Sequence, residues 1–178
     1  MFNEQKAISV AAYLLKLQNN KSDKYWLAKV MYYIERESLL KNGKPLFGDQ
    51  LFSLPYGPIV SSVNDGIDLC EYPGESTWNE YFKLRGKIVE LLKDADYSIL
   101  SPFEKKIIEE SYGQFKGWSF AKLHDFFSKL PEYKETKNRE RIFYKDILAG
   151  EGFEAEIADE ALAELSYINT VESILHCA

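Results

Sequence analysis

The chain has 178 residues, a length typical of one domain that can bury a hydrophobic core without help from a metal or a disulfide. Its 28 acidic residues outnumber its 22 basic ones, and the net charge of −6 argues against non-specific nucleic-acid binding, which needs Lys and Arg to neutralise phosphates. Cys70 and Cys177 lie far apart and form no CxxC pair, so neither a zinc site nor a disulfide framework is indicated. Residues 1–10 lack a signal-peptide pattern and the apolar run at 7–17 is too short to cross a membrane, so we expect a cytoplasmic protein without membrane association.

Two helices are predicted at the start of the chain. Residues 4–18 are rich in helix formers and apolar on more than one face, which is typical of a well-buried helix. A second helix should begin near Asp23 and end at Asn42-Gly43, because apolar residues recur with helical spacing from Leu27 to Ile34. The charged run at 35–37 is most simply interpreted as a solvated patch on that helix.

A stiff corner, Pro55-Tyr56-Gly57-Pro58, follows a short strand predicted at 51–54. Pro55 favours an extended residue before it, and Gly57 can adopt the positive φ that other residues avoid. Pro58 suits the first turn of a helix, where its missing N–H costs nothing. We therefore expect the chain to turn from a strand directly into a helix that runs to about residue 69.

Residues 78–92 are predicted to form a β-hairpin. Its strands would cover 81–84 and 87–92, joined by the two-residue connection Arg85-Gly86. A helix over 88–94 is the alternative for the second half of this segment.

The clearest local signal is Ser101-Pro102-Phe103-Glu104. Ser at the N-cap, Pro at the first helical position and Glu at the third make a capping box, so a helix should begin here and end at Gly117. Ser119 should cap a further short helix that stops at Pro131.

The last part of the chain begins with a polar loop over 132–141. Its run 134–141 is the one candidate for a basic patch, although a solvated loop is the simpler interpretation. Residues 142–144 are expected to be extended, and 153–176 to form an amphipathic helix with acidic residues near its start. The prediction is a single domain over 1–178: mainly α, a compact helical domain with a small β-hairpin or short-strand element.

Patterns that carry chemistry are absent from the sequence. His124-Asp125 are neighbours on a predicted helix and point about 100° apart, so a packing or capping histidine is favoured over a catalytic base. Ser61 and Ser62 lie near a helix start but in no nucleophile elbow, and Cys70 is interpreted as a packing residue. Phosphate-binding loops and clusters with metal-ligand spacing are also missing. We expect no catalytic residues, no metal and no cofactor.

A combination of motifs over 25–65 resembles the Panacea antitoxin domain family, also described as SocA-like or phage-associated GepA-like. The resemblance extends over about 7–150. Within 25–65 the resemblance is carried by Leu27-Ala28-Lys29, Tyr32, Tyr33, Gly43-Lys44-Pro45, Gly48-Asp49 and Tyr56-Gly57-Pro58. Further along the chain it is carried by Leu100-Ser101, Tyr112-Gly113, Leu123 and His124.

The resemblance implies an antitoxin that neutralises a cognate protein toxin by direct contact, with a protease or chaperone as a further partner and no direct nucleic-acid contact. Such a role needs a rigid scaffold with a few interface anchors and no catalytic machinery. Six residues are selected as those that shape a shared toxin-binding surface: Tyr32, Arg36, Asp49, Tyr56, Gly57 and Pro58. Two interpretations stay open for Tyr56, a packing plug or a direct contact, and two for Asp49, a turn cap or an ion pair with Arg36.

Two other classes of function compete with this one. The chain could be a phage- or mobile-element-derived host-interaction or protease-adapter protein without its own toxin. It could also be a small hydrolase that uses His124 or a serine at a helix start. A toxic neighbouring gene distinguishes the antitoxin from the first alternative, and a cleft that joins His124 to a nucleophile would favour the second.

Overall fold

The computed structural model describes residues 2–72, 74, 76–156, 159 and 163. The helices and strands follow one another in the order α1 (Glu4–Leu17), β1 (Lys21–Asp23), α2 (Lys24–Asn42), β2 (Leu51–Leu54), β3 (Gly57–Val60), α3 (Ser61–Leu69), α4 (Trp78–Tyr81), β4 (Phe82–Arg85), β5 (Ile88–Leu91), the 3-10 turn η1 (Tyr97–Ile99), α5 (Pro102–Phe115), α6 (Phe120–Phe127), β6 (Glu140–Ile142) and α7 (Tyr144–Gly150).

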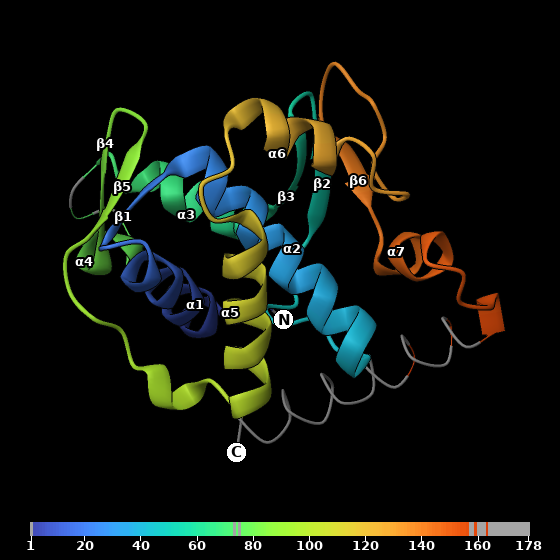
Figure 1. Cartoon of the computed structure of the whole chain (residues 1–178), viewed down its shortest axis with the longest axis horizontal. Helices are drawn as coiled ribbons and strands as arrows, with labels where there is room; N and C mark the ends of the chain where they lie inside the picture. The colour runs from blue at the N-terminus through green and yellow to red at the C-terminus, as the bar shows by residue number, and fades with distance from the viewer. Residues whose placement is uncertain (1, 73, 75, 157–158, 160–162, 164–178) are drawn as a thin grey trace.

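Helix α2 is the centre of the molecule, and the other elements pack around it (Figure 1). Residues on all sides of it are buried, from Trp26 and Leu27 near its start to Leu39 near its end. Helices α1 and α5 pack against it, and α6 and strand β3 also lie against it. The prediction of a well-buried first helix is confirmed, since eight consecutive or near-consecutive residues of α1 between Ala7 and Leu15 are buried.

Two three-stranded antiparallel sheets flank this helical centre (Figure 1). The first has the order β1-β5-β4, in which Ser22 of β1 lies opposite Val89 of β5. The second has the order β3-β2-β6, in which Leu51 of β2 lies opposite both Val60 and Ile142. Each sheet therefore joins segments that are far apart in the sequence.

The prediction of a mainly helical domain with one small β element is wrong. Helices predominate, but two complete sheets make the fold a mixed α and β one. Strands β1 and β6 have three residues each and lie where the sequence indicated a helix break and a loop. Such short strands carry almost no alternation of their own, and they exist because a partner strand elsewhere in the chain pairs with them.

Strand β3 corrects the prediction for Pro58. This residue is not in the first turn of a helix; it lies inside β3, opposite Ser53 of β2. Proline lacks the N–H that a central strand needs, but β3 is an edge strand of its sheet, where a missing donor is tolerated. Helix α3 begins only after β3, at Ser61.

The hairpin at 78–92 is confirmed in kind and shifted in detail. Its strands are β4 and β5, and Gly86-Lys87, not Arg85-Gly86, forms the connection, with Arg85 opposite Ile88. Gly86 has a φ of +62°, as a two-residue hairpin turn requires. The alternative of a helix over 88–94 is wrong, because Ile88–Leu91 is a strand.

Local helix signals hold well. The Asp23 carboxylate accepts hydrogen bonds from the N–H groups of Tyr25 and Trp26 at the start of α2, and Gly43 ends that helix with a φ of +66°. The Ser101 capping box forms as predicted. Helix α7 was not predicted. Residues 142–144 were expected to be extended, but Tyr144 begins this helix. The predicted helix over 153–176 falls largely outside the described residues, and the single-domain assignment to 1–178 stays a prediction.

Candidate functional site

The stiff corner noted in the sequence is a tight β-hairpin between β2 and β3. Leu54 and Gly57 are the last paired residues, so Pro55 and Tyr56 alone make the connection. Pro55 fixes its own φ, and Gly57 has a φ of +103°, which L side chains rarely adopt. Proline and glycine are thus required here by the backbone path of a two-residue turn.

Gly57 is also required by what lies beneath it. A Cβ atom at this position would lie 3.3 Å from Cε of Lys29 and 3.3 Å from Cβ of Phe127. The corner therefore packs closely on side chains of α2 and α6, and its position is fixed by both helices.

Lys29 of α2 is the polar support of the corner. Its side chain is only 2% exposed, and its ammonium donates a hydrogen bond of 2.8 Å to the carbonyl oxygen of Pro58. The same nitrogen lies 5.0 Å from the centroid of the Tyr25 ring, a cation–π arrangement. Burial without a carboxylate partner among the described residues lowers the pKa of Lys29 to about 7.

Tyrosine hydroxyls hold the rest of the turn. Tyr25 donates to the carbonyl oxygen of Tyr56 at 2.7 Å, and Tyr133 donates to that of Leu54 at 3.1 Å. Burial raises the pKa of Tyr25, so it remains a donor. With Lys29 on Pro58, three side chains from two distant segments satisfy carbonyls of a turn that has few N–H donors of its own.

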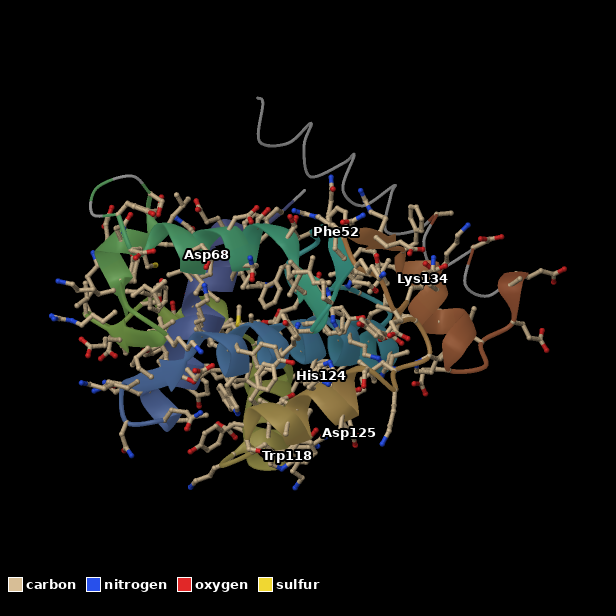
Figure 2. All side chains as sticks on the ribbon, turned by 90° about the horizontal axis from the view of Figure 1, so that it is seen from above. Phe52, Asp68, Trp118, His124, Asp125 and Lys134 are labelled. Carbon is tan, nitrogen blue, oxygen red and sulfur yellow. The ribbon has the colours of Figure 1, made fainter. Side chains whose placement is uncertain are left out.

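The side chain of Tyr56 lies outside this supported backbone. It is 61% exposed, an exposure that does not fit a packing plug. Its ring lies 5.9 Å from that of Phe120 and 6.2 Å from that of His124, and Phe120 in turn lies 4.5 Å from Tyr25. We call Tyr25, Tyr56, Phe120, His124 and the adjoining Trp118 the aromatic face. Trp118, His124 and Asp125 come from the α6 region and lie on the same side of the molecule (Figure 2).

Two hollows border Tyr56. The larger, of about 590 Å³, lies between Tyr56, Trp118 and Phe120. The smaller, of about 200 Å³, lies between Tyr56, Lys29 and Asp68. Tyr56 therefore stands between two concave regions, each with aromatic and charged residues in its lining, which is a shape suited to a protruding segment of another protein.

Tyr32 and Arg36, which we selected as surface-shaping residues, lie in the interior. Arg36 Nε donates to Glu132 Oε1 at 2.8 Å, and the hydroxyl of Tyr32 donates to the same oxygen at 2.8 Å. Arg36 also pairs with Glu151, just beyond α7. Hydrogen bonds and charge attraction from Glu132 raise the pKa of Arg36 above its ordinary value against the effect of burial. The pair ties α2 to the segments that follow α6 and α7.

The interpretation of 35–37 as a solvated patch is wrong, because Glu35 and Arg36 are buried. Glu35 accepts hydrogen bonds from the N–H groups of Phe47 and Gly48 and from the hydroxyl of Tyr144. Burial raises the pKa of the Glu35 carboxyl, and the hydrogen bonds from these donors offset part of that rise. Glu35 therefore fixes the loop that leads into β2.

Asp49 acts as a cap. Its carboxylate accepts hydrogen bonds from the backbone N–H and the hydroxyl of Ser62, in the first turn of α3. Arg36 forms its ion pairs with glutamates, and not with Asp49. Of the six selected residues, the structure thus brings Tyr56, Gly57 and Pro58 together in the corner, while Tyr32, Arg36 and Asp49 support neighbouring segments.

The candidate catalytic residues do not form a constellation. His124 contacts the rings of Phe120 and Tyr56, and Ser61 accepts a hydrogen bond from Arg139, so none of these contacts joins His124 to a nucleophile. Burial raises the pKa of the Cys70 thiol to about 12, which keeps it protonated. Within the described part of the chain no group of three His, Cys, Asp or Glu residues could hold a metal ion. Nor is any described helix both long and apolar enough to cross a membrane.

Sequence reasoning missed most of the aromatic face. Phe120 and Trp118 were not singled out, because an aromatic residue beside a predicted short helix is usually a core residue. Lys29 was quoted only as part of a motif. A usable signal did exist for it, since Lys29 interrupts an otherwise apolar run between Leu27 and Met31, and Tyr25 lies one helical turn before it.

The comparison with protein-family models matches residues 27–134 to the family described as "Antitoxin SocA-like, Panacea domain". The match covers more than half of the chain and contains α2 from Leu27 onward, the corner, and the aromatic face except Tyr25. Searches of curated proteins and of solved structures gave no match. The chain belongs to the SocA-like antitoxin family that is defined by the Panacea domain.

Proposed function

We propose that this chain neutralises a cognate protein toxin by binding it directly at the aromatic face. Membership of the family supports an antitoxin-like role in general and a protein as the partner. The specific step, neutralisation through contact at Tyr56, is the part that we add.

The observation that carries the proposal is the exposure of Tyr56 on a fixed backbone. An interface anchor binds tightly when it is large, amphipathic and already held in its bound position, because little conformational entropy is then lost. Tyr56 meets these conditions: it is 61% exposed, its turn is held by Lys29 and Tyr25, and a hollow lies on each side of it. Its ring presents an apolar face and a hydroxyl to a partner.

A contact of this kind needs no bond-making chemistry from the chain, which agrees with the non-enzymatic role that the family suggests. The toxin could be blocked on binding or delivered to a protease that removes it. These two modes leave different traces, since blocking preserves the amount of toxin and delivery lowers it.

Co-expression with the neighbouring gene tests the proposal. We expect that gene to arrest growth on its own and the wild-type chain to restore growth. Tyr56→Ala should abolish the rescue while the melting temperature stays near that of the wild type, because an exposed ring contributes little to the core. Loss of an interface anchor of this type costs about 2 kcal/mol or more of binding free energy, roughly thirtyfold in affinity.

Tyr72→Ala is the matched control, because Tyr72 is 55% exposed and lies outside the aromatic face. It should rescue growth as well as the wild type does. Rescue by a folded Tyr56→Ala variant would refute the assignment of the aromatic face. A neighbouring gene without toxicity would favour a host-interaction or adapter protein without its own toxin, and immunoblotting of the toxin during rescue would separate blocking from delivery.

A further inference from the structure

A second exposed surface lies on the sheet formed by β3, β2 and β6, away from the aromatic face. In Figure 2, Phe52 and Trp118 lie on opposite sides of the view. Along β2, Leu51 and Ser53 are buried in the interior, so Phe52 between them points to the outer face of the sheet. Arg141 of β6 is the residue directly opposite Phe52 and shares that face.

Two arginines lie over the Phe52 ring. The Cζ atom of Arg139 is 3.7 Å from the ring centroid, which is the distance of a stacked guanidinium, and that of Arg141 is 5.7 Å away. Arg141 also lies 5.5 Å from the centroid of Phe143, and Lys145 Nζ lies 5.7 Å from it. We call Phe52, Arg139, Arg141, Phe143 and Lys145 the cationic face.

The cations of this face are not neutralised by the described part of the protein. Arg139, Arg141 and Lys145 are exposed and form no ion pair with any described residue, and Lys134 with Glu140 is the one pair within the segment 134–145. That segment has five basic and two acidic residues, a net charge of +3, in a chain of net charge −6. The cationic face is therefore a local exception to an acidic molecule.

The stacking prepares the guanidinium group of Arg139 for a particular ligand. A guanidinium that lies flat on an aromatic ring keeps its N–H groups at the edge, where a carboxylate can accept two parallel hydrogen bonds. The hydroxyl of Ser61 accepts from one N–H of Arg139 and orients the group further. Phe143, which is 49% exposed, adds an apolar contact beside the charges.

We propose that the cationic face binds a short acidic segment of a partner protein, whose Asp or Glu side chains pair with the guanidinium forks of Arg139 and Arg141. A nucleic acid is a poorer match, because its phosphates would continue past the small patch onto a surface that is acidic overall. Apart from Phe52 the face lies beyond residue 134, outside the segment that the family model matches. The proposal therefore does not depend on toxin binding at the aromatic face.

The test uses the full chain and a short fluorescent peptide of Asp and Glu with one central Leu, followed by fluorescence anisotropy. We expect binding that weakens as salt is raised. Arg139→Gln/Arg141→Gln should weaken it by about tenfold or more, because charge-assisted hydrogen bonds are lost. Arg139→Lys/Arg141→Lys should weaken it nearly as much, since lysine keeps the charge but has no planar fork.

Lys83→Gln/Lys105→Gln is the matched control: it removes the same charge from β4 and α5 and should leave the affinity within about twofold of the wild type. Four results of the binding experiments would overturn the proposal. These are no peptide binding by the wild type, an equal loss in the control, wild-type affinity in the double lysine variant, and equal or tighter arginine-dependent binding of a single-stranded oligonucleotide of the same charge. Self-association of the wild type that the double glutamine variant loses would also overturn it, because a second copy would then occupy the face.

Discussion

Gly57→Ala tests whether the corner rests on α2 and α6 as described. Two penalties apply to this substitution. The φ of +103° disfavours any L side chain, at a cost of about 1–2 kcal/mol. In addition, the new Cβ would lie 3.3 Å from both Lys29 Cε and Phe127 Cβ. Phe127 is fully buried and cannot retreat freely, so overpacking adds about 1–3 kcal/mol.

Gly43→Ala separates the two penalties. Gly43 also has a positive φ, +66°, but a Cβ there would meet nothing within 4 Å. Only the backbone cost of about 1–2 kcal/mol applies to it. We therefore expect Gly57→Ala to lose about 2–5 kcal/mol of unfolding free energy, and about 1–3 kcal/mol more than Gly43→Ala.

Urea unfolding of both purified variants, followed by tryptophan fluorescence, measures the difference. The midpoints should fall in the order wild type, Gly43→Ala, Gly57→Ala, with unchanged m-values. In a thermal scan each kcal/mol corresponds to a drop of about 2–4 °C for a chain of this size. Equal losses in the two variants would refute the reasoning, because the corner would then not be in close contact with Lys29 and Phe127.

Two further predictions concern buried charges. Glu132→Ala should cost about 3–5 kcal/mol of unfolding free energy, because it leaves Arg36 and Tyr32 buried without their shared acceptor. Glu132→Gln should cost less, since an acceptor remains; a loss below about 1 kcal/mol in Glu132→Ala, measured by urea unfolding, would contradict the interior role of this network. Lys29 should make stability depend on pH. Unfolded lysine keeps its proton up to about pH 10.5 whereas folded Lys29 releases it near 7, so the unfolded chain binds more protons between these values and stability rises with pH. The free energy of unfolding of the wild type, measured relative to Lys29→Met, should increase by about 1.4 kcal/mol per pH unit from pH 7 to 9, and a difference that stays flat would show that folded Lys29 keeps its proton over this range.

Helix boundaries were the part of the fold most open to prediction. Asp23, Gly43, Ser101 and Ser119 end or begin helices as expected, since each acts on backbone groups within four residues of itself. The turn at 55–58 was likewise recognisable as a stiff corner, because proline and glycine constrain the backbone wherever they occur.

The candidate site was open to prediction only in part. Tyr56, Gly57 and Pro58 lie together because they are neighbours in sequence. Their supports are distant: Lys29 and Tyr25 come from α2, and Phe120 from α6. No local pattern states that a lysine of α2 will lie under a turn that begins only after that helix has ended.

What the sequence determined by itself was therefore the longer helices α1, α2, α3, α5 and α6 with most of their caps, the hairpin of β4 and β5, and the stiffness of the corner, all of which depend on interactions between near neighbours. Tertiary structure alone decided that Lys21–Asp23 and Glu140–Ile142 become strands, that Pro58 lies on a sheet edge, and that Arg36 is buried against Glu132. The reason is physical: a three-residue strand or a buried ion pair has no stability of its own and forms only when folding supplies a partner from a remote part of the chain.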